Sequence, residues 1–131
     1  MPKRVLIVED NPLGLELISE LIKAEGHVAI TVTDGAEVLA IARAQRPDLI
    51  LMDIQLPGVD GLTVTHTLKA DPETKEIPII GISAHALRDD VQRALQAGCT
   101  AYLPKPLDTR CFRDLVAQLL GEDPSSLPSL D

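Results

Sequence analysis

The sequence is poor in aromatic side chains and in positive charge, and both shortages exclude classes of function. Aromatic residues make up 2% of the 131 residues, namely Tyr102 and Phe112, and there is no tryptophan. Such a chain lacks the stacking platforms of single-strand nucleic-acid binders and the aromatic walls of a flavin or sugar site. Twelve Lys and Arg against 20 Asp and Glu give a net charge of −8. The acidic balance argues against general nucleic-acid binding and against attraction to anionic membranes.

Cysteines and long apolar runs are also scarce. The spacing of Cys99 and Cys111 fits neither a redox pair nor a zinc site, and we expect a small buried residue at each position. The apolar run Val5–Val8 is too short for a signal peptide or a membrane span. These features predict a cytoplasmic protein with reduced thiols and no membrane insertion.

Apolar segments of strand length alternate with segments of helical period. The predicted strands are Val5–Val8, Val28–Val32, Leu49–Met52, Ile77–Ser83 and Thr100–Leu103. Predicted helices begin after Asn11, after Asp34, near Leu62, at Leu87 and after Asp108 or Thr109, and they stop at Gly26, Pro47, Ala70, Gly98 and Gly121. Their predicted inward faces include Leu17, Ile18, Leu21 and Ile22 in the first helix and Val91, Ala94 and Leu95 in the fourth.

This alternation predicts an α/β fold of the flavodoxin-like, doubly wound (βα)5 type. We expect a five-stranded parallel sheet in the order 2-1-3-4-5, with helices on both faces. One domain spans residues 1–121, and the polar segment 122–131, rich in Pro, Ser and Asp, is predicted to be disordered. Ligands of such sheets bind beyond the carboxyl ends of the strands, so the residues that follow each strand are the candidates for function.

Polar side chains stand at four of these strand ends. Glu9 and Asp10 follow the first strand, Asp53 follows the third, Ser83 ends the fourth, and Lys105 follows the fifth. A lone aspartate in such a place is most often a helix cap or turn residue, but the joint occurrence favours a site. Three crowded carboxylates repel one another, and Mg²⁺ relieves that repulsion. A hydroxyl and an ammonium group beside them can hold phosphoryl oxygens, so the central Asp53 is a candidate nucleophile that would form an aspartyl phosphate.

Four segments resemble the receiver domain of response regulators in two-component signalling. They are VLIVEDNP (5–12), LILMDIQLPGVDG (49–61), IPIIGISA (77–84) and AGCTAYLPKP (97–106). The resemblance runs from about Lys3 to Leu120, and its start is similar to single-domain regulators and to receivers of hybrid histidine kinases. No segment long enough for a DNA-binding or catalytic domain follows Gly121. Together with Met1 and the short acidic tail, this favours a single-domain regulator.

The resemblance implies a role for each residue at the strand ends. Asp53 would accept a phosphoryl group from a phosphohistidine on a sensor histidine kinase or a histidine phosphotransfer protein. Asp10 and Asp53 would bind Mg²⁺ or Mn²⁺ directly, with Gln55 contributing its backbone carbonyl and Glu9 acting through water. Lys105 and Ser83 would contact the phosphoryl group, which the domain would both acquire and lose by its own catalysis rather than as a turnover enzyme.

The same resemblance implies a switch. Ser83 would turn toward the phosphoryl group and Tyr102 would move inward with it, which changes the surface formed by residues 87–97, 100–103 and the last helix. A downstream protein target, and no nucleic acid directly, would bind that surface. The family also implies a cis peptide bond between Lys105 and Pro106, and it places Gln55 and His85 at positions that tune autodephosphorylation.

Three other hypotheses follow from the same pattern. A pseudo-receiver would keep the fold as an interaction module without phosphorylation, but the acidic set, Ser83 and Lys105 argue against it. A flavodoxin-type electron carrier is disfavoured by the missing aromatic residues and by the lack of a Ser/Thr-rich phosphate loop after the first strand. A P-loop nucleotidase is unsupported because the sequence contains no GxxxxGK[ST] motif.

Overall fold

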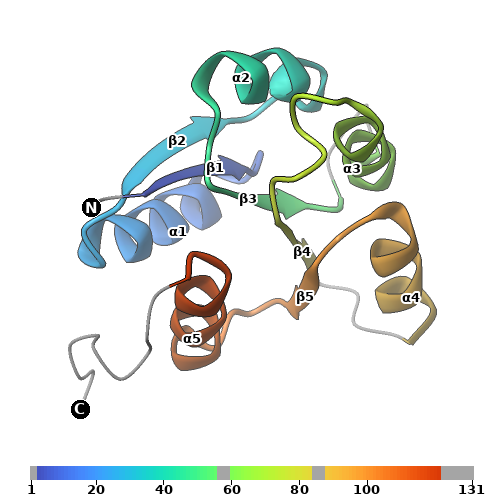
Figure 1. The fold of residues 1–131 in the computed structure, drawn as a ribbon. Helices are drawn as coiled ribbons and strands as arrows, with labels where there is room; N and C mark the ends of the chain where they lie inside the picture. Colours follow the sequence, from blue (N-terminus) through green and yellow to red (C-terminus); the bar gives the residue numbers. More distant parts are fainter. Residues whose placement is uncertain (1–2, 56–59, 84–87, 122–131) are drawn as a thin grey trace.

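The computed structural model describes residues 3–55, 60–83 and 88–121, in which strands and helices alternate (Figure 1). The elements are β1 Arg4–Val8, α1 Pro12–Ala24, β2 Val28–Val32, the 3₁₀ turn η1 Gly35–Glu37, α2 Val38–Gln45, β3 Leu49–Asp53, α3 Gly61–Ala70, β4 Ile79–Ser83, α4 Arg88–Ala97, β5 Ala101–Pro104 and α5 Thr109–Leu119. The sheet order is β2-β1-β3-β4-β5, and each neighbouring pair is parallel. The predicted flavodoxin-like α/β fold and its strand order are therefore confirmed.

Alternate side chains of the central strands face opposite layers of helices. In β1, Leu6 and Val8 pack with residues of α2, α3 and α4, whereas Val5 and Ile7 pack with residues of α1 and α5. Figure 1 shows the same division, with α1 and α5 on one side of the sheet and the other three helices opposite. Strands covered on both faces read as continuous apolar runs, so the charged residues that end β1 and β3 stand out in the sequence.

Local side-chain and backbone geometry sets the ends of the helices. The Asn11 side chain accepts hydrogen bonds from the backbone N–H groups of Leu13 and Gly14, at 3.0 and 3.4 Å, and caps α1. After α1 and α4 the chain turns through Gly26 and Gly98, whose φ angles are +83° and +118°. Such angles suit glycine because it has no β-carbon, so both predicted helix stops are confirmed.

Several predicted boundaries move by one or two residues. Strand β4 begins at Ile79 rather than Ile77, because Pro78 has no N–H with which to donate a hydrogen bond to a neighbouring strand. Strand β5 runs one residue later than predicted, and α3 begins one residue earlier, with Asp60 as its cap. The predicted start of the fourth helix at Leu87, the loop residues 57 and 58, and the tail 122–131 lie outside the described residues.

Three predictions of burial are wrong. Leu95 of α4 is 46% exposed and Leu17 of α1 is 50% exposed, although both were expected to face inward. In α4 the inward position is occupied by Ala94, which is fully buried. Successive helical residues point about 100° apart, so Leu95, the next residue, is turned away from it. Cys99 is buried as expected, but Cys111 is exposed on the outer face of α5.

Candidate functional site at the carboxyl edge of the sheet

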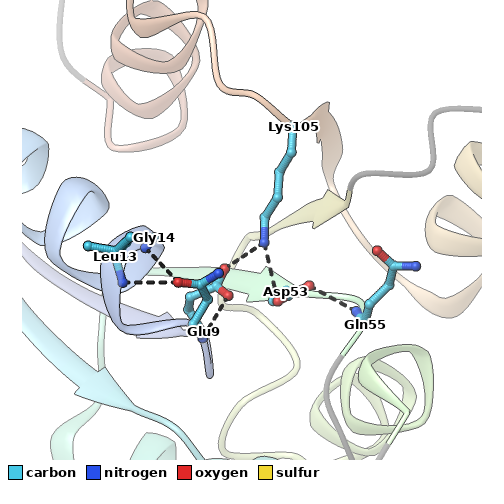
Figure 2. Close-up of polar contacts among 7 residues, drawn as sticks. Glu9, Leu13, Gly14, Asp53, Gln55 and Lys105 are labelled. Carbon is cyan, nitrogen blue, oxygen red and sulfur yellow. Dashed lines mark hydrogen bonds and ion pairs between the residues drawn. The ribbon is translucent and has the colours of Figure 1, made fainter.

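Side chains from β1, β3 and β5 meet at the carboxyl edge of the sheet (Figure 2). Glu9 and Asp10 follow β1, Asp53 is the last residue of β3, and Lys105 follows β5. Lys105 Nζ lies 2.9 Å from Glu9 Oε2 and 3.4 Å from Asp53 Oδ2. Four of the residues that the sequence singled out therefore lie together, although up to 96 positions of the chain separate them.

Glu9 is held in one place from two directions. Its Oε1 accepts a hydrogen bond from the Asn11 backbone N–H at 3.1 Å, and its Oε2 accepts one from Lys105. The residue is 1% exposed and lies against Gly14 in the first turn of α1. The buried carboxylate therefore has a partner at each oxygen, as a buried charge requires.

Asp53 is oriented by its own loop. Its Oδ1 accepts a hydrogen bond from the Gln55 backbone N–H at 2.9 Å, and its Oδ2 faces Lys105. The residue is 3% exposed and ends a strand that is buried along its whole length. The carboxylate is thus presented at the sheet edge by a rigid element.

The charges of this cluster influence one another. Burial is the largest effect on Glu9 and raises its pKa above the ordinary value of 4.5, and the hydrogen bond from Lys105 offsets this only in part. Burial would lower the pKa of Lys105, but the hydrogen bond to Glu9 and the charges of Asp53 and Glu9 together outweigh it and raise that pKa. One ammonium group therefore faces more negative charge than it can neutralise.

The acidic residues form a donor set that fits a hard divalent cation. Carboxylate oxygens of Glu9, Asp10 and Asp53 all lie within 4.8 Å of one another. Asp10 is exposed, whereas the other two are buried, so the group opens to solvent on one side. Oxygen donors from several carboxylates, together with waters, are the surroundings that Mg²⁺ prefers.

Ser83 and Tyr102 lie beside this cluster and line one pocket. The pocket has a volume of about 200 Å³ and is bounded by Ile54, Gln55, Asp60, Leu62, Ser83, Arg93 and Tyr102. Ser83 is 2% exposed, and its backbone carbonyl accepts the Lys105 backbone N–H at 2.8 Å. Tyr102 is partly buried against the apolar cluster beneath the pocket. The pocket thus joins the sheet edge to the surface of α4 and β5.

The structure adds residues that the sequence did not single out for function. Asn11 was expected only to cap a helix, yet its backbone also fixes Glu9. Asp60 and Arg93 share the pocket of Ser83, and in the sequence they look like a helix cap and a solvated helix face.

The family resemblance also implied a cis peptide bond before Pro106 and a role for His85. The Lys105–Pro106 peptide bond is cis as expected, whereas His85 lies outside the described residues.

The sheet order and the acidic cluster together define a class of protein. The sequence model of the response regulator receiver domain matches residues 5–117, and the chain belongs to this family of two-component signalling domains. The chain is 48% identical over 122 residues to the polar-differentiation response regulator DivK of Brucella anthropi, a match that covers 93% of this chain and 99% of the relative. The protein of the same name in Brucella ovis is 47% identical over the same length and the same shares of both chains.

Solved structures agree with this assignment. The receiver domain of the sensor histidine kinase PA1611 from Pseudomonas aeruginosa superimposes with a TM-score of 0.85 at 34% identity, covering 93% of this chain and all of that one. That crystal contains a magnesium ion coordinated in the active-site cleft. The receiver domain of a histidine kinase from Syntrophus aciditrophicus gives a TM-score of 0.83 at 30% identity, covering 91% of this chain and 90% of that one.

Helix length and polarity also bear on the prediction about membranes. Among the described residues, none of the helices combines the length and the apolar character that a membrane crossing demands.

Proposed function

We propose that this receiver domain is a switch controlled by phosphorylation of Asp53. The supporting observation is the convergence of Glu9, Asp10, Asp53 and Lys105 at one sheet edge from three different strands. The donor is a phosphohistidine on a sensor histidine kinase or on a histidine phosphotransfer protein. The two free cysteines and the acidic net charge fit a cytoplasmic location for this chain and for its phosphoryl donor.

The reaction is a displacement at phosphorus. An oxygen of Asp53 attacks the phosphorus atom of the donor and forms a P–O bond, while the P–N bond to the donor imidazole breaks. The electron pair of that bond stays on the imidazole nitrogen, which takes up a proton. Lys105 and the Ser83 hydroxyl then hold the oxygens of the transferred group, because charge-assisted hydrogen bonds are strong at short distance.

A divalent cation fits this site through Asp10, Asp53 and the Gln55 backbone carbonyl, with Glu9 acting through water. When bound, Mg²⁺ or Mn²⁺ would neutralise the carboxylates and the phosphoryl oxygens that otherwise repel one another. The chain itself supplies the geometry, since the Gln55 N–H fixes one oxygen of Asp53 and Lys105 faces the other. Hydrolysis of the acyl phosphate later resets the switch, and Gln55 beside Asp53 is placed to influence its rate.

Phosphorylation is relayed through the pocket that Ser83 and Tyr102 share. A new dianion on Asp53 attracts the Ser83 hydroxyl, and the space that Ser83 leaves is open to the Tyr102 ring. The ring's movement changes the surface of α4, β5 and α5, which a downstream protein target recognises in one state better than in the other.

An intact-mass measurement tests the phosphoacceptor. Incubation with acetyl phosphate and Mg²⁺ should add one phosphoryl group to the wild-type chain and none to Asp53→Asn. The matched control is Asp114→Asn, which changes an exposed aspartate of α5 that is not among the residues of the site. A mass gain that persists in Asp53→Asn would contradict the assignment. Absence of both phosphorylation and beryllofluoride binding would favour the pseudo-receiver.

Intrinsic fluorescence tests the switch, because Tyr102 is the single tyrosine and the sequence has no tryptophan. Beryllofluoride with Mg²⁺ should change the Tyr102 emission in the wild-type chain, and Ser83→Ala should reduce that change. An unaltered emission in protein that has bound beryllofluoride would contradict the proposed movement.

A further inference from the structure

An apolar groove lies between α3 and the segment formed by η1 and α2, which pack side by side on one side of the sheet (Figure 1). The groove has a volume of about 230 Å³ and is lined by Gly35, Ala36, Leu39, Thr63, Val64 and Thr67. None of these lining residues belongs to the acidic cluster, to the pocket of Ser83 and Tyr102, or to α4, β5 and α5. The groove is therefore a surface that the proposed phosphorylation switch does not use.

The groove offers an occupant apolar contact rather than hydrogen bonds. Leu39 and Val64 belong to the apolar cluster that fills this side of the sheet, and Ala36 contributes only a methyl group. The Thr67 hydroxyl donates a hydrogen bond to the Thr63 backbone carbonyl at 3.0 Å. Because that hydroxyl already has a partner within its own helix, an apolar group can occupy the groove without leaving it unpaired.

The volume fits a single side chain better than a small-molecule ligand. Pockets for such ligands usually measure about 300–1,000 Å³ and enclose most of the ligand. This groove is smaller, and it opens to solvent beside Ala36, Thr63 and Thr67, which are exposed. An aliphatic side chain that enters a small apolar depression is a common anchor where one protein binds a segment of another.

The rim of the groove is negatively charged. Asp34 Oδ1 accepts a hydrogen bond from the Ala36 backbone N–H at 2.9 Å, so its carboxylate lies beside a lining residue. Glu37 follows Ala36 and is exposed. Residues 24–42 and 47–68, which include all six lining residues, contain neither lysine nor arginine. The two segments that form the groove therefore bring acidic side chains and no basic ones.

The first basic residue that follows the groove in each helix is engaged elsewhere. In α2, Arg43 pairs with Asp71 and lies 3.4 Å from a carboxylate oxygen of Glu73, so these three side chains together carry one further negative charge. In α3, the Lys69 ammonium donates hydrogen bonds to two backbone carbonyls, at 3.1 and 2.6 Å. Neither cation is available to offset the rim carboxylates.

Charge complementarity identifies the kind of occupant. The segment 122–131 contains three acidic residues and no basic one, and the whole chain carries a net charge of −8. The chain's own tail, a second copy of the chain or a nucleic acid would each bring more negative charge to an acidic rim, which disfavours association. We infer that this groove binds a basic segment of another protein, which inserts one aliphatic side chain between α2 and α3 and places Lys or Arg beside Asp34 and Glu37.

A library of random peptides tests the inference without assuming the sequence of a partner. Peptides are selected for binding to the wild-type chain in EDTA, so that the result does not depend on Mg²⁺ or on phosphorylation of Asp53. Each enriched peptide is then titrated against two variants by fluorescence anisotropy. Ala36→Phe fills the groove, and Ala40→Phe adds the same ring at an exposed position of α2 that is not a lining residue.

We expect a group of peptides whose affinity falls several-fold or more in Ala36→Phe and is unchanged in Ala40→Phe. These peptides should be rich in Lys or Arg and should contain an aliphatic residue whose replacement by serine abolishes binding. Glu37→Lys should weaken the same peptides several-fold, and added salt should weaken them as well. The matched control is Glu16→Lys, which makes the same change of net charge at an exposed position of α1 and should leave the affinity unchanged.

Circular dichroism establishes that each variant is folded, and Thr67→Phe fills the groove from α3 should Ala36→Phe fail to fold. The inference is overturned when no enriched peptide distinguishes the groove-filling variant from Ala40→Phe, or when those that do are acidic or lack an aliphatic residue. Enrichment of sequences similar to 122–131 would identify the tail as the occupant. Self-association that the groove-filling variant abolishes would identify a second copy, and either result would also overturn the inference.

Discussion

Gly61 lies directly against the backbone that carries Asp53. A β-carbon at position 61 would be 2.6 Å from the Asp53 carbonyl oxygen and 2.6 Å from Ile54 Cα. The Gly61 N–H also donates a hydrogen bond to the Ile54 carbonyl at 3.1 Å. The start of α3 is therefore in contact with the same segment that ends in the candidate phosphoacceptor.

The first prediction concerns Gly61→Ala. The added methyl group must push α3 and the end of β3 apart, since it would meet backbone atoms that cannot rotate away. Overpacking of this kind costs about 1–3 kcal/mol, measured by urea unfolding. We also expect weaker Mg²⁺ binding by calorimetry, because Asp53 and Gln55 shift with the backbone.

Thr63→Ala, on an exposed position of the same helix, is the control. Wild-type stability and Mg²⁺ affinity in Gly61→Ala would contradict the prediction.

The second prediction concerns the addition and removal of Mg²⁺. A cation that binds the assembled carboxylates only in the folded state stabilises that state by about 2.7 kcal/mol at a concentration 100 times its dissociation constant. Mg²⁺ should therefore raise the thermal midpoint of the wild type, and EDTA should reverse the rise. Asp10→Asn should lose most of the increase without unfolding, because Asp10 is exposed. A midpoint that does not respond to Mg²⁺ in the wild type would argue against the cation site.

The third prediction concerns acid sensitivity away from the site. Asp71 accepts a hydrogen bond from Arg43 of α2 and another from the Glu73 backbone N–H at 2.8 Å. The hydrogen bond from Arg43 is the main reason that the pKa of Asp71 lies below its ordinary value of 3.8, and the Glu73 N–H adds to it. An acid whose pKa is lowered by folding stabilises the protein above its unfolded pKa, and this stabilisation is lost as the pH falls through the folded pKa.

The corresponding measurement is urea unfolding of the wild type and Asp71→Asn between about pH 5 and pH 2. The variant should be less stable than the wild type at neutral pH, and the gap should close as the pH falls. Asp114→Asn, at an exposed position of α5, should follow the wild-type curve. A gap of constant size over this range would show that Arg43 does not perturb Asp71.

The fourth prediction distinguishes the two thiols. Burial raises the pKa of the Cys99 thiol, which is 6% exposed, whereas Cys111 is exposed on α5. The thiolate is the reactive form, so an aromatic disulfide reagent should modify one thiol quickly in native protein and the second only after unfolding. Cys111→Ser should abolish the fast reaction and Cys99→Ser should preserve it. The reverse assignment would contradict the described burial.

The elements and their order could be predicted because burial on both faces gives β1, β3 and β4 uninterrupted apolar runs. Details that depend on how a helix is rotated were harder to predict. Leu17 and Leu95 have apolar side chains in a helical repeat, yet both are exposed because smaller or better placed neighbours fill the inward arc. The burial predicted for Cys111 is wrong for the same reason, since Phe112 takes the buried position beside it.

For the site, the topology predicted which residues stand at the sheet edge but not how they are bonded. That Glu9 rather than Asp53 is the nearer partner of Lys105 follows from side-chain length, from the Asn11 N–H and from the space at Gly14. The contact with Lys105 itself joins residues 96 positions apart and has no local sequence pattern. The presence of Arg93 in the pocket of Ser83 likewise depends on how α4 packs beside β5.

The strand order also determines when the site can exist during folding. Lys105 and Glu9 are 96 residues apart, and Lys105 and Asp53 are 52 apart, so both contacts close very long loops. Loop closure of this size has to be compensated by the packing of all the strands in between. No fragment that lacks β5 can place Lys105 beside Glu9 and Asp53, and a partly folded chain holds these carboxylates without that counter-charge. The arrangement in which Lys105 faces both Glu9 and Asp53 therefore arises only with completion of the whole sheet.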